Sequence, residues 1–333
     1  MSDNAYSKKP VPYQQIIEAL LDENHPFPPK YLHRFSDISP EFLGALKECW
    51  TKINPDRRAG LLSDLEDLSD ADTLCSFNDL GRFALADSDP RVRAVATRLL
   101  WQAGDKSLVP VFLRMAHTDE DEVVRAAVVS ALGEYVYMGE LDELPAKMLQ
   151  NIEDELIAIY RGSDTPLVRR RALESLGFSS REEVEGFIRS AIKMDSPWRA
   201  SALFAMGRSA DQQWEQSVLE MIDDPDLEVQ FEAVRAAGEL EIRKARQPII
   251  SLLEEHDDLD EGVRYAAIWS LSQIGGEGVR ELLERLLEEA DEEEEVEHLE
   301  NALDNLSFTE GGGFFNMFDF DLDDSDEDDI EDA

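Results

Sequence analysis

The sequence predicts an all-α, right-handed α-solenoid of repeated helix pairs that ends in a disordered acidic tail. Three observations lead to this prediction. A phrase that begins with Asp and continues with Val-Arg recurs along the chain, as in Asp89–Gly104 and Asp121–Tyr135. Each copy places apolar residues at helical spacing. Further amphipathic segments lie between the copies, so the repeating unit is two helices joined by a turn, which bury their apolar faces only by stacking on neighbouring pairs.

The Val-Arg pair fixes the register of the repeat. With the first residue of the pair as position zero, positions four and eight are apolar in every copy, which gives one apolar stripe. Position seven is often Ala or Ser, and such small side chains allow neighbouring helices to approach closely. Arg57-Arg58 and Val296-Glu297 lie about one step outside the array and are interpreted as degenerate end copies. Position zero falls at Val92, Val124, Val168, Trp198, Val229 and Val263.

Start and stop signals agree with a helix in each copy. Three residues before position zero the sequence usually places Asp, which can cap the first free N–H groups and favours the positive end of the helix dipole. Thr165 takes this place in one copy, and Pro90 follows Asp89, where its missing N–H costs little. The glycines interpreted as helix stops are Gly133, Gly177, Gly207 and Gly238, and the remaining capping aspartates are Asp121, Asp195, Asp226 and Asp260.

The other segments complete the helix pairs in chain order. Residues 13–23 predict a first helix, and residues 25–35 predict an extended link broken by proline. An insertion at residues 140–162 explains the longest step between copies and carries a longer first helix. The other first helices are predicted at residues 107–118, 182–194, 212–224 and 245–257. The expected domains are a flexible N-terminus at 1–11, a helical cap with a degenerate repeat at 12–75, the solenoid at 76–285, capping helices at 286–308 and the tail at 309–333.

The phrase Asp-x-x-Val-Arg-x-x-Ala, on the second helix of a short helix pair, resembles the HEAT-like repeats of the phycobilisome-lyase type. The resemblance covers residues 76–280 clearly and implies a fold rather than an activity. It also implies that Asp and Arg form a structural pair that ties each turn to the neighbouring repeat. We expect this ladder to be interrupted where Thr165 and Gln230 depart from the pattern. Its residues are Asp89, Arg93, Asp121, Arg125, Arg169, Asp195, Arg199, Asp226, Asp260 and Arg264.

The charge of the chain restricts the class of partner. A formal net charge of −42 argues against nucleic acid, which is held by Lys and Arg, and against anionic membranes. A basic protein partner, or solubility alone, fits this charge. Residues 286–333 hold 21 of the 74 acidic residues and none of the 32 basic ones. The sequence has no apolar N-terminal segment and no apolar run long enough to span a membrane, so we expect a soluble cytoplasmic protein. Its two cysteines form no CxxC motif and are expected to be small core residues.

No catalytic motif accompanies the repeats. Hydroxylase relatives among HEAT-like proteins hold a di-iron centre with His-Glu dipeptides, and none of the five histidines here precedes Glu. A metal site with carboxylates is an alternative at His117 and His256, although histidines in solvated turns are the simpler interpretation. A bilin-lyase activity rests on the family name alone. We therefore expect no catalytic residue, cofactor or metal.

The inner face of a solenoid is the expected partner-binding surface. If the apolar stripe faces the core, positions two and six point away from it. These positions are small or polar in the first copies and aromatic in the last three, and aromatic residues and Arg are enriched in binding hot spots. The alternative is that the rings pack between neighbouring helices. The candidate residues are Arg98, Arg170, Phe204, Phe231, Arg235, Tyr265 and Trp269.

The tail is the second candidate for partner binding. Three glycines precede a segment in which phenylalanines alternate with acids, and its high charge and low apolar content predict disorder. A solubilising role is the simpler interpretation, and the sharper one uses the aromatic side chains as anchors in a partner. These anchors are Phe314, Phe315, Phe318 and Phe320.

The sequence as a whole favours a non-catalytic scaffold or adaptor that binds a protein. One alternative is a HEAT-like enzyme or its subunit, similar to a bilin lyase or a metal-dependent hydroxylase. Another is a solenoid whose tail folds back into its own inner face, because a tethered segment binds at high effective concentration. The partner, the pathway and the oligomeric state do not follow from the sequence.

Overall fold

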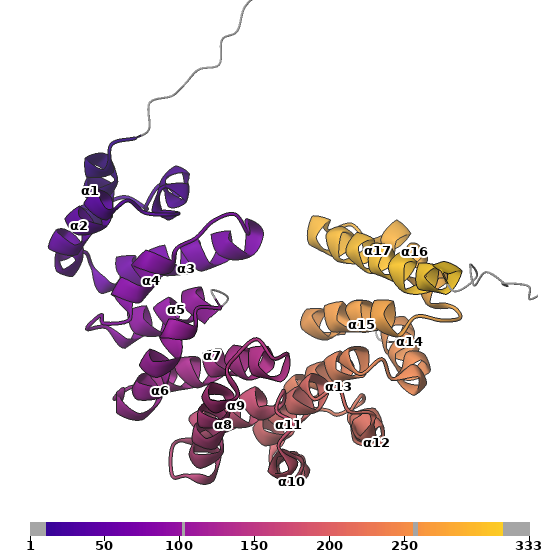
Figure 1. Cartoon of the computed structure of the whole chain (residues 1–333). Helices are drawn as coiled ribbons and strands as arrows, with labels where there is room; N and C mark the ends of the chain where they lie inside the picture. The colour runs from indigo at the N-terminus through magenta and orange to yellow at the C-terminus, as the bar shows by residue number, and fades with distance from the viewer. Residues whose placement is uncertain (1–10, 102–103, 256–258, 316–333) are drawn as a thin grey trace, which may run out of the picture. The chain divides into compact units, whose positions relative to one another are not determined.

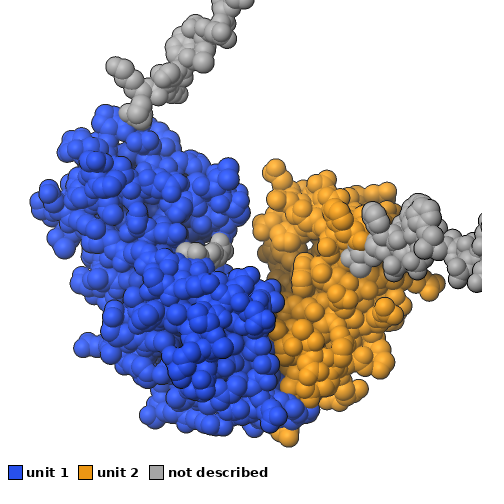
Figure 2. Space-filling view, in the orientation of Figure 1, with its two compact units in different colours: residues 1–191 blue, residues 192–333 orange. Residues whose placement is uncertain are grey.

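The computed structural model describes residues 11–101, 104–255 and 259–315, and every regular element in these ranges is a helix (Figure 1). The chain forms two compact units, Met1–Ala191 and Ile192–Ala333, which we call unit 1 and unit 2 (Figure 2). The repeat block predicted as continuous at 76–285 is therefore divided between the two units. None of the described helices is both long and apolar enough to cross a membrane.

Unit 1 contains three packed helix pairs, α4 with α5, α6 with α7 and α8 with α9, and a helical cap precedes them. The second helices stack in the order α3, α5, α7 and α9. The elements are α1 (Tyr13–Leu21), η1 (Pro29–Phe35), α2 (Pro40–Cys49), η2 (Trp50–Lys52), α3 (Pro55–Ala71), α4 (Asn78–Ala84), α5 (Pro90–Trp101), η3 (Lys106–Leu108), α6 (Val109–Thr118), α7 (Glu122–Glu140), α8 (Ala146–Arg161), α9 (Pro166–Leu176) and α10 (Glu182–Ala191).

Unit 2 repeats the same arrangement with α12 and α13, α14 and α15, and α16 and α17 as packed pairs. Its second helices stack in the order α11, α13, α15 and α17. The elements are α11 (Ser196–Arg208), η4 (Gln212–Trp214), α12 (Glu215–Leu219), α13 (Leu227–Glu239), η5 (Arg243–Ala245), α14 (Arg246–Glu255), α15 (Glu261–Ile274), α16 (Val279–Glu289) and α17 (Glu293–Phe315). The prediction of an all-α solenoid of helix pairs is confirmed.

The predicted apolar stripe forms the core of both units. Positions zero, four and eight are buried in all six copies, for example at Val124, Val128 and Leu132 on α7. Burial of such side chains supplies about 1.5–3 kcal/mol each. The second helix of each pair carries one such stripe. A single pair cannot cover it alone, so stacking on neighbouring pairs completes the core.

The aspartate caps mostly act as predicted. The side chain of Asp121 accepts hydrogen bonds from the N–H groups of Val123 and Val124 at the start of α7, and Thr165 accepts from Val168 at the start of α9. Asp195 precedes α11 but its side chain makes no capping bond. The reason lies in the first turn, where Pro197 has no N–H to donate.

The glycines predicted near helix ends lie there in three of four copies, because Gly177 ends α9 and Gly207 and Gly238 each precede the last residue of their helix. Gly133 instead lies inside α7, which continues to Glu140. A Cβ at Gly133 would lie 3.2 Å from Cα of Ser175, and a Cβ at Gly238 would lie 2.8 Å from Cα of Ser270. Gly207 faces α13 in the same way. These glycines therefore let successive second helices approach backbone to backbone.

The two ends of the chain depart from the predicted boundaries. Residues 25–35 contain the 3-10 helix η1 rather than an extended link, because proline fits the first helical turn and Tyr31 and Phe35 bury their rings. The last pair starts with α16 at Val279, seven residues before the predicted cap. Helix α17 continues through the glycines to Phe315, which places Phe314 and Phe315 on a helix, since adding a turn to an existing helix is easier than nucleating one. Phe318 and Phe320 lie outside the described residues.

Candidate functional site

In unit 1 the arginine at position one joins two of the repeats to the next, at Arg93 and at Arg125. Arg93 donates from Nε and Nη2 to the two carboxylate oxygens of Asp119, at 2.8 and 2.7 Å. Arg125 makes the same two bonds to Asp164, at 3.0 and 2.7 Å. Both guanidinium groups also donate to backbone carbonyls of their own turn, Arg93 to that of Asp87. The acid therefore belongs to the following repeat, where it lies one or two residues before the capping residue.

The pairing predicted within one phrase is accordingly wrong. Asp89 bonds to Arg91 rather than to Arg93, and its bond to that guanidinium lowers the pKa of Asp89 to about 2. Asp121 caps α7. The resemblance to HEAT-like repeats implied this Asp–Arg pair, but the side chain of the capping aspartate is already committed to backbone N–H groups.

The degenerate first copy keeps the ladder in its most buried form. Arg58 Nη1 lies 2.5 Å from Oδ2 of Asp87, and the two side chains are 5% and 0% exposed. Trp50 Nε1 donates to the same carboxylate oxygen at 2.6 Å, and the N–H of Asp89 donates to the other. Both oxygens of the Asp87 carboxylate are therefore hydrogen-bonded, and a buried charge with such partners is tolerated in the interior, whereas an unpaired one is costly.

The ladder in unit 2 is thinner. Arg199 reaches Asp224 through a single 3.4 Å contact to each carboxylate oxygen, and Arg264 Nε donates to Glu295 at 2.6 Å. Gln230 takes the place of the arginine in one copy, and the ladder was predicted to be interrupted there. Its side-chain amide donates to the carbonyl of Ile222 rather than to an acid. Arg169, in the copy with Thr165, likewise donates to a carbonyl of the preceding first helix, that of Tyr160. Asp226 caps α13 and Asp260 caps α15.

Unit 1 also contains a groove along its stacked second helices. The groove has a volume of about 420 Å³ and is lined by α3, α5, α7 and the start of α9. Its apolar wall includes Trp101 and Val123, whose side chains are 44% and 53% exposed. Exposed apolar residues that line one hollow are unusual on a surface with no partner. We call this feature the unit 1 groove, and its lining is Glu66, Ser69, Asp70, Arg98, Leu99, Trp101, Val123, Ala126, Ala127, Ser130, Ala131, Leu167 and Arg171.

The charged residues at the unit 1 groove are paired along its edge. Arg98 donates from Nε and Nη2 to the carboxylate of Glu66, at 2.8 and 3.0 Å. Arg171 lies 2.5 Å from Glu174 of the same helix. Of the predicted partner-binding residues, Arg98 lies in this groove, whereas Arg170 does not line it. The floor is lined by small residues of α7, so the groove has a neutral floor and a polar edge.

Sequence reasoning found part of the unit 1 groove. It assigned the inner face to positions two and six, and Arg98, Ala126 and Ser130 at those positions line the groove. It missed Trp101 and two apolar residues, Val123 and Leu167, that directly precede position zero. An apolar residue in the first turn, outside the core stripe, is the signal that could have revealed them.

In unit 2 the predicted aromatic surface is largely occupied by its own neighbours. The guanidinium of Arg235 lies 4.4 Å from the centre of the Phe204 ring, and that of Arg208 lies 5.2 Å from it. Arg235 also pairs with Glu232 and Glu239 on its own helix. The half-buried Phe231 lies beside Gly262 of α15. The alternative that the rings pack between helices therefore describes Phe204 and Phe231.

The last two aromatic candidates line a cavity of about 370 Å³ between α15 and α17. The Tyr265 ring stacks on His298 with ring centres 4.2 Å apart, and its hydroxyl donates to Glu261 at 3.0 Å. Trp269 is 39% exposed. Polar groups of α17, including Asn301 and Asn305, form the opposite wall.

The two histidines considered for a metal do not form such a site in the described residues. His117 Nε2 lies 2.7 Å from Glu155 on α8, and His256 lies outside the described residues. Cys49 is buried and donates to the carbonyl of Leu46, as expected of a core thiol. Cys75 is only half-buried and lies beside His33 and Asp72, so the prediction of a core thiol is wrong for it.

Comparison with known proteins bears on the repeats. The HEAT-repeat family matches residues 79–150 and 215–304, one segment in each unit. The chain is a HEAT-like repeat protein. No curated protein matches the sequence.

Among solved structures, Escherichia coli YibA is similar, with 17% identity, a TM-score of 0.40 and coverage of 81% of this chain and 97% of that one. Human deoxyhypusine hydroxylase, solved with glycerol, has 16% identity, a TM-score of 0.38 and coverage of 89% and 96%. Kap95p, solved with RanGDP, has 14% identity, a TM-score of 0.39 and coverage of 94% and 44%. Likeness at this level carries no information about activity or partner.

Proposed function

We propose that this HEAT-like protein is a non-catalytic scaffold that holds an amphipathic segment of a protein partner in the unit 1 groove. The observation that carries the proposal is the exposure of Trp101 and Val123 in one hollow of about 420 Å³. Stacked helices carry all of its described lining residues. A preformed apolar groove lowers the entropic cost of binding, because little of it must be ordered when a partner enters.

The lining indicates which kind of segment fits. The floor consists of small residues of α7, and apolar side chains from α5 and α9 flank it. An amphipathic helix can place apolar residues three or four apart into such a groove. Glu66 and Asp70 on α3 lie on one edge beside Arg98, which is bonded to Glu66, so this edge of the groove is polar.

The net charge of −42 favours the same class of partner. Two oppositely charged proteins associate faster at low ionic strength, because long-range attraction steers their encounter. The partner segment we propose is therefore amphipathic and basic. The apolar contacts give the affinity, and the charges give the rate and the orientation.

The test compares two substitutions at the two ends of α7 in the full-length protein. Val123 in its first turn and Leu141, the residue after its last, are 53% and 52% exposed, but only Val123 lines the unit 1 groove. Affinity capture from native lysate, quantified by mass spectrometry, should give proteins that bind wild type and Leu141→Asp but not Val123→Asp. A captured protein is then purified, and its Kd is measured directly. Placing a carboxylate on the groove wall should raise that Kd at least about tenfold, since it desolvates against apolar groups.

Two results would contradict the proposal. Equal capture by Val123→Asp and Leu141→Asp would move the binding site away from the unit 1 groove. A captured protein whose Kd does not change with Val123→Asp would do the same, even if its recovery fell. Circular dichroism of both variants establishes that their helix content matches wild type.

A further inference from the structure

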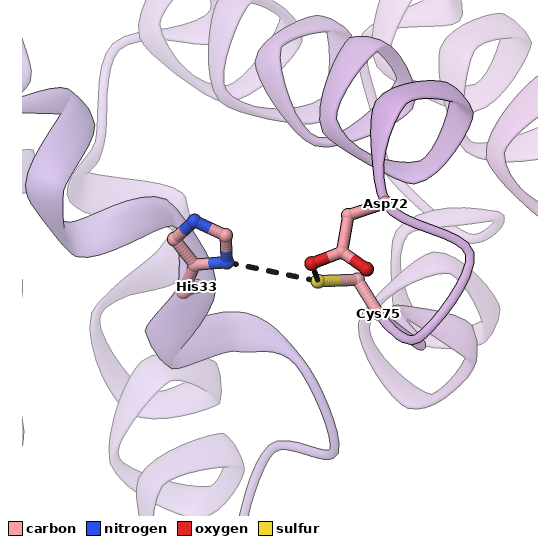
Figure 3. A group of neighbouring side chains, drawn as sticks. All are labelled: His33, Asp72 and Cys75. Atoms are coloured by element: carbon pink, nitrogen blue, oxygen red, sulfur yellow. Dashed lines mark hydrogen bonds between the residues drawn. The ribbon is translucent and has the colours of Figure 1, made fainter.

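Three potential metal ligands meet in the cap of unit 1, outside the unit 1 groove (Figure 3). His33 lies on η1, Asp72 is the residue that ends α3, and Cys75 lies in the turn before α4. The ligand atoms of all three side chains lie within 4.8 Å of one another. Within the described residues, these three side chains are the His, Cys and acidic residues found close enough together to hold a metal ion.

The local fold holds both segments in place. Tyr31 and Phe35 are buried on either side of His33, which leaves the imidazole exposed on the opposite face of η1. The Asp72 carboxylate accepts the N–H of Leu74, and the Cys75 N–H donates to the Asp72 carbonyl, so the turn that carries Asp72 and Cys75 is closed.

Two further bonds join η1 to this turn. The N–H of Ser76 donates to Ser36 Oγ at 3.1 Å, and the N–H of Asp37 donates to the carbonyl of Ser76 at 2.8 Å. The residues that follow His33 are thereby tied to the residue that follows Cys75. The three ligands consequently keep their spacing without an ion, which is the condition for a preorganised site.

The spacing matches what a tetrahedral zinc ion requires. Cys75 Sγ lies 3.7 Å from His33 Nδ1 and 3.6 Å from Asp72 Oδ2. With Zn–S of about 2.3 Å and Zn–N or Zn–O of about 2.0–2.1 Å, tetrahedral angles separate sulfur from the other ligand atom by about 3.5 Å. Both distances to sulfur therefore fit one tetrahedral ion to within a few tenths of an ångström, and the imidazole and carboxylate atoms lie within 4.8 Å of each other.

We propose that His33, Asp72 and Cys75 bind one Zn²⁺ ion, with a water molecule as the fourth ligand on the exposed side of His33. A thiolate, an imidazole and a carboxylate form a donor set suited to this borderline-soft cation. Zinc replaces the thiol proton of Cys75, which leaves as H⁺, and no oxidation or reduction occurs. The ion links η1 to the end of α3 and so fastens the N-terminal cap to the first repeat.

The same three residues do not suit a nucleophilic cysteine. In a Cys–His pair the acid orients the imidazole, whereas here Asp72 accepts the thiol hydrogen of Cys75 (Figure 3). The arrangement serves a metal better than it serves catalysis.

The test uses Co²⁺ as a spectroscopic probe in the tag-free, full-length, reduced protein. One equivalent of Co²⁺ should give a thiolate-to-cobalt charge-transfer band in the near ultraviolet together with intense visible bands of tetrahedral cobalt. Zn²⁺ added afterwards should abolish both. Cys75→Ser should lose the charge-transfer band, and His33→Gln should weaken Co²⁺ binding at least about tenfold, in the range typical for loss of one ligand.

Cys49→Ala is the matched control, because Cys49 is the other cysteine of the chain and is buried at the end of α2. It should keep the full cobalt spectrum. The proposal is overturned if folded wild type gives no thiolate band, or if Cys75→Ser retains it. A band lost in Cys49→Ala but kept in Cys75→Ser would assign the metal to the other thiol and would likewise overturn it.

Discussion

The two units use one repeat in two ways. In unit 1 the starts of α5 and α7 are joined to the following turns by half-buried, two-pronged Arg–Asp pairs, and small residues of α7 leave the groove open. In unit 2 the corresponding charged contacts are fewer, and aromatic rings fill the inner positions with guanidinium groups stacked on them. The difference teaches that side chains enriched in binding sites can instead serve as internal packing, while a run of Ala and Ser can leave room for a partner.

The largest expected effect concerns the buried ladder pair of unit 1. Arg58→Met leaves the fully buried Asp87 carboxylate without its counter-charge and should lower the free energy of unfolding of unit 1 by about 3–5 kcal/mol. Arg264→Met, which removes a more exposed pair with Glu295, should cost about 1 kcal/mol or less in unit 2. Hydrogen exchange followed by mass spectrometry reports the two units separately. Equal losses of unfolding free energy in Arg58→Met and Arg264→Met would contradict a difference between the ladders of the two units.

The glycine contacts come next in size. Gly238→Ala should destabilise unit 2 by about 2–3 kcal/mol, because the new methyl group meets Cα of Ser270 at 2.8 Å, and backbone cannot move aside cheaply. Gly133→Ala, at the same repeat position in unit 1, meets Ser175 at 3.2 Å and should cost about 1 kcal/mol.

Gly186 on α10 is the control for helix propensity, since a Cβ there meets no atom within 4 Å. Gly186→Ala should stabilise unit 1 by about 0.5–1 kcal/mol. Urea denaturation followed by hydrogen exchange measures all three variants. If Gly238→Ala stabilises the protein as Gly186→Ala does, the close approach of α13 and α15 is not a constraint.

Acid should weaken unit 1 through its ladder. The hydrogen bonds from Arg125 lower the pKa of Asp164 below its ordinary 3.8, even though burial opposes the shift. Such a group adds stability above its unfolded pKa and loses it as pH falls through the lower, folded pKa. The urea midpoint of unit 1 should therefore drop below about pH 4, and Arg125→Met should flatten that drop. An unchanged pH slope in Arg125→Met would show that Asp164 does not carry it.

The smallest effect separates packing from recognition in unit 2. Arg235→Lys weakens the stack on Phe204 and should cost about 0.5–1 kcal/mol, without changing the capture of the partner that Val123→Asp abolishes. Two quantities are measured for Arg235→Lys: its affinity for the captured protein and its midpoint of thermal unfolding. Loss of capture with little loss of stability would return the aromatic surface of unit 2 to the role that the sequence predicts for it.

Repeat periodicity predicted the parts of this molecule that depend on local pattern. The core stripe, the caps at Asp121 and Thr165 and the long α8 follow from residues that are near neighbours in sequence. The partner of Arg93 does not, because it lies 26 residues away in the next turn. Likewise, Gly133 reads as a helix stop until the helix packed against it is known.

The candidate sites were harder to predict for the same reason. The unit 1 groove combines α3, α5, α7 and α9, which span more than a hundred residues of sequence. His33 lies 42 residues before Cys75, and the proline-rich segment that brings them together showed no recognisable ligand spacing. The sequence pattern of one helix does not indicate which of its faces a helix far away in the sequence will cover.

The ladder also makes two joints of unit 1 interchangeable. Arg93 and Arg125 offer the same two-pronged donor, and each following turn offers one carboxylate just before its helix. Excising Asp119 through Ser163 would present Asp164 to Arg93 in place of Asp119. A stretch with such similar joints can be lengthened or shortened by whole modules during gene duplication, and the number of repeats becomes a variable of evolution and of design.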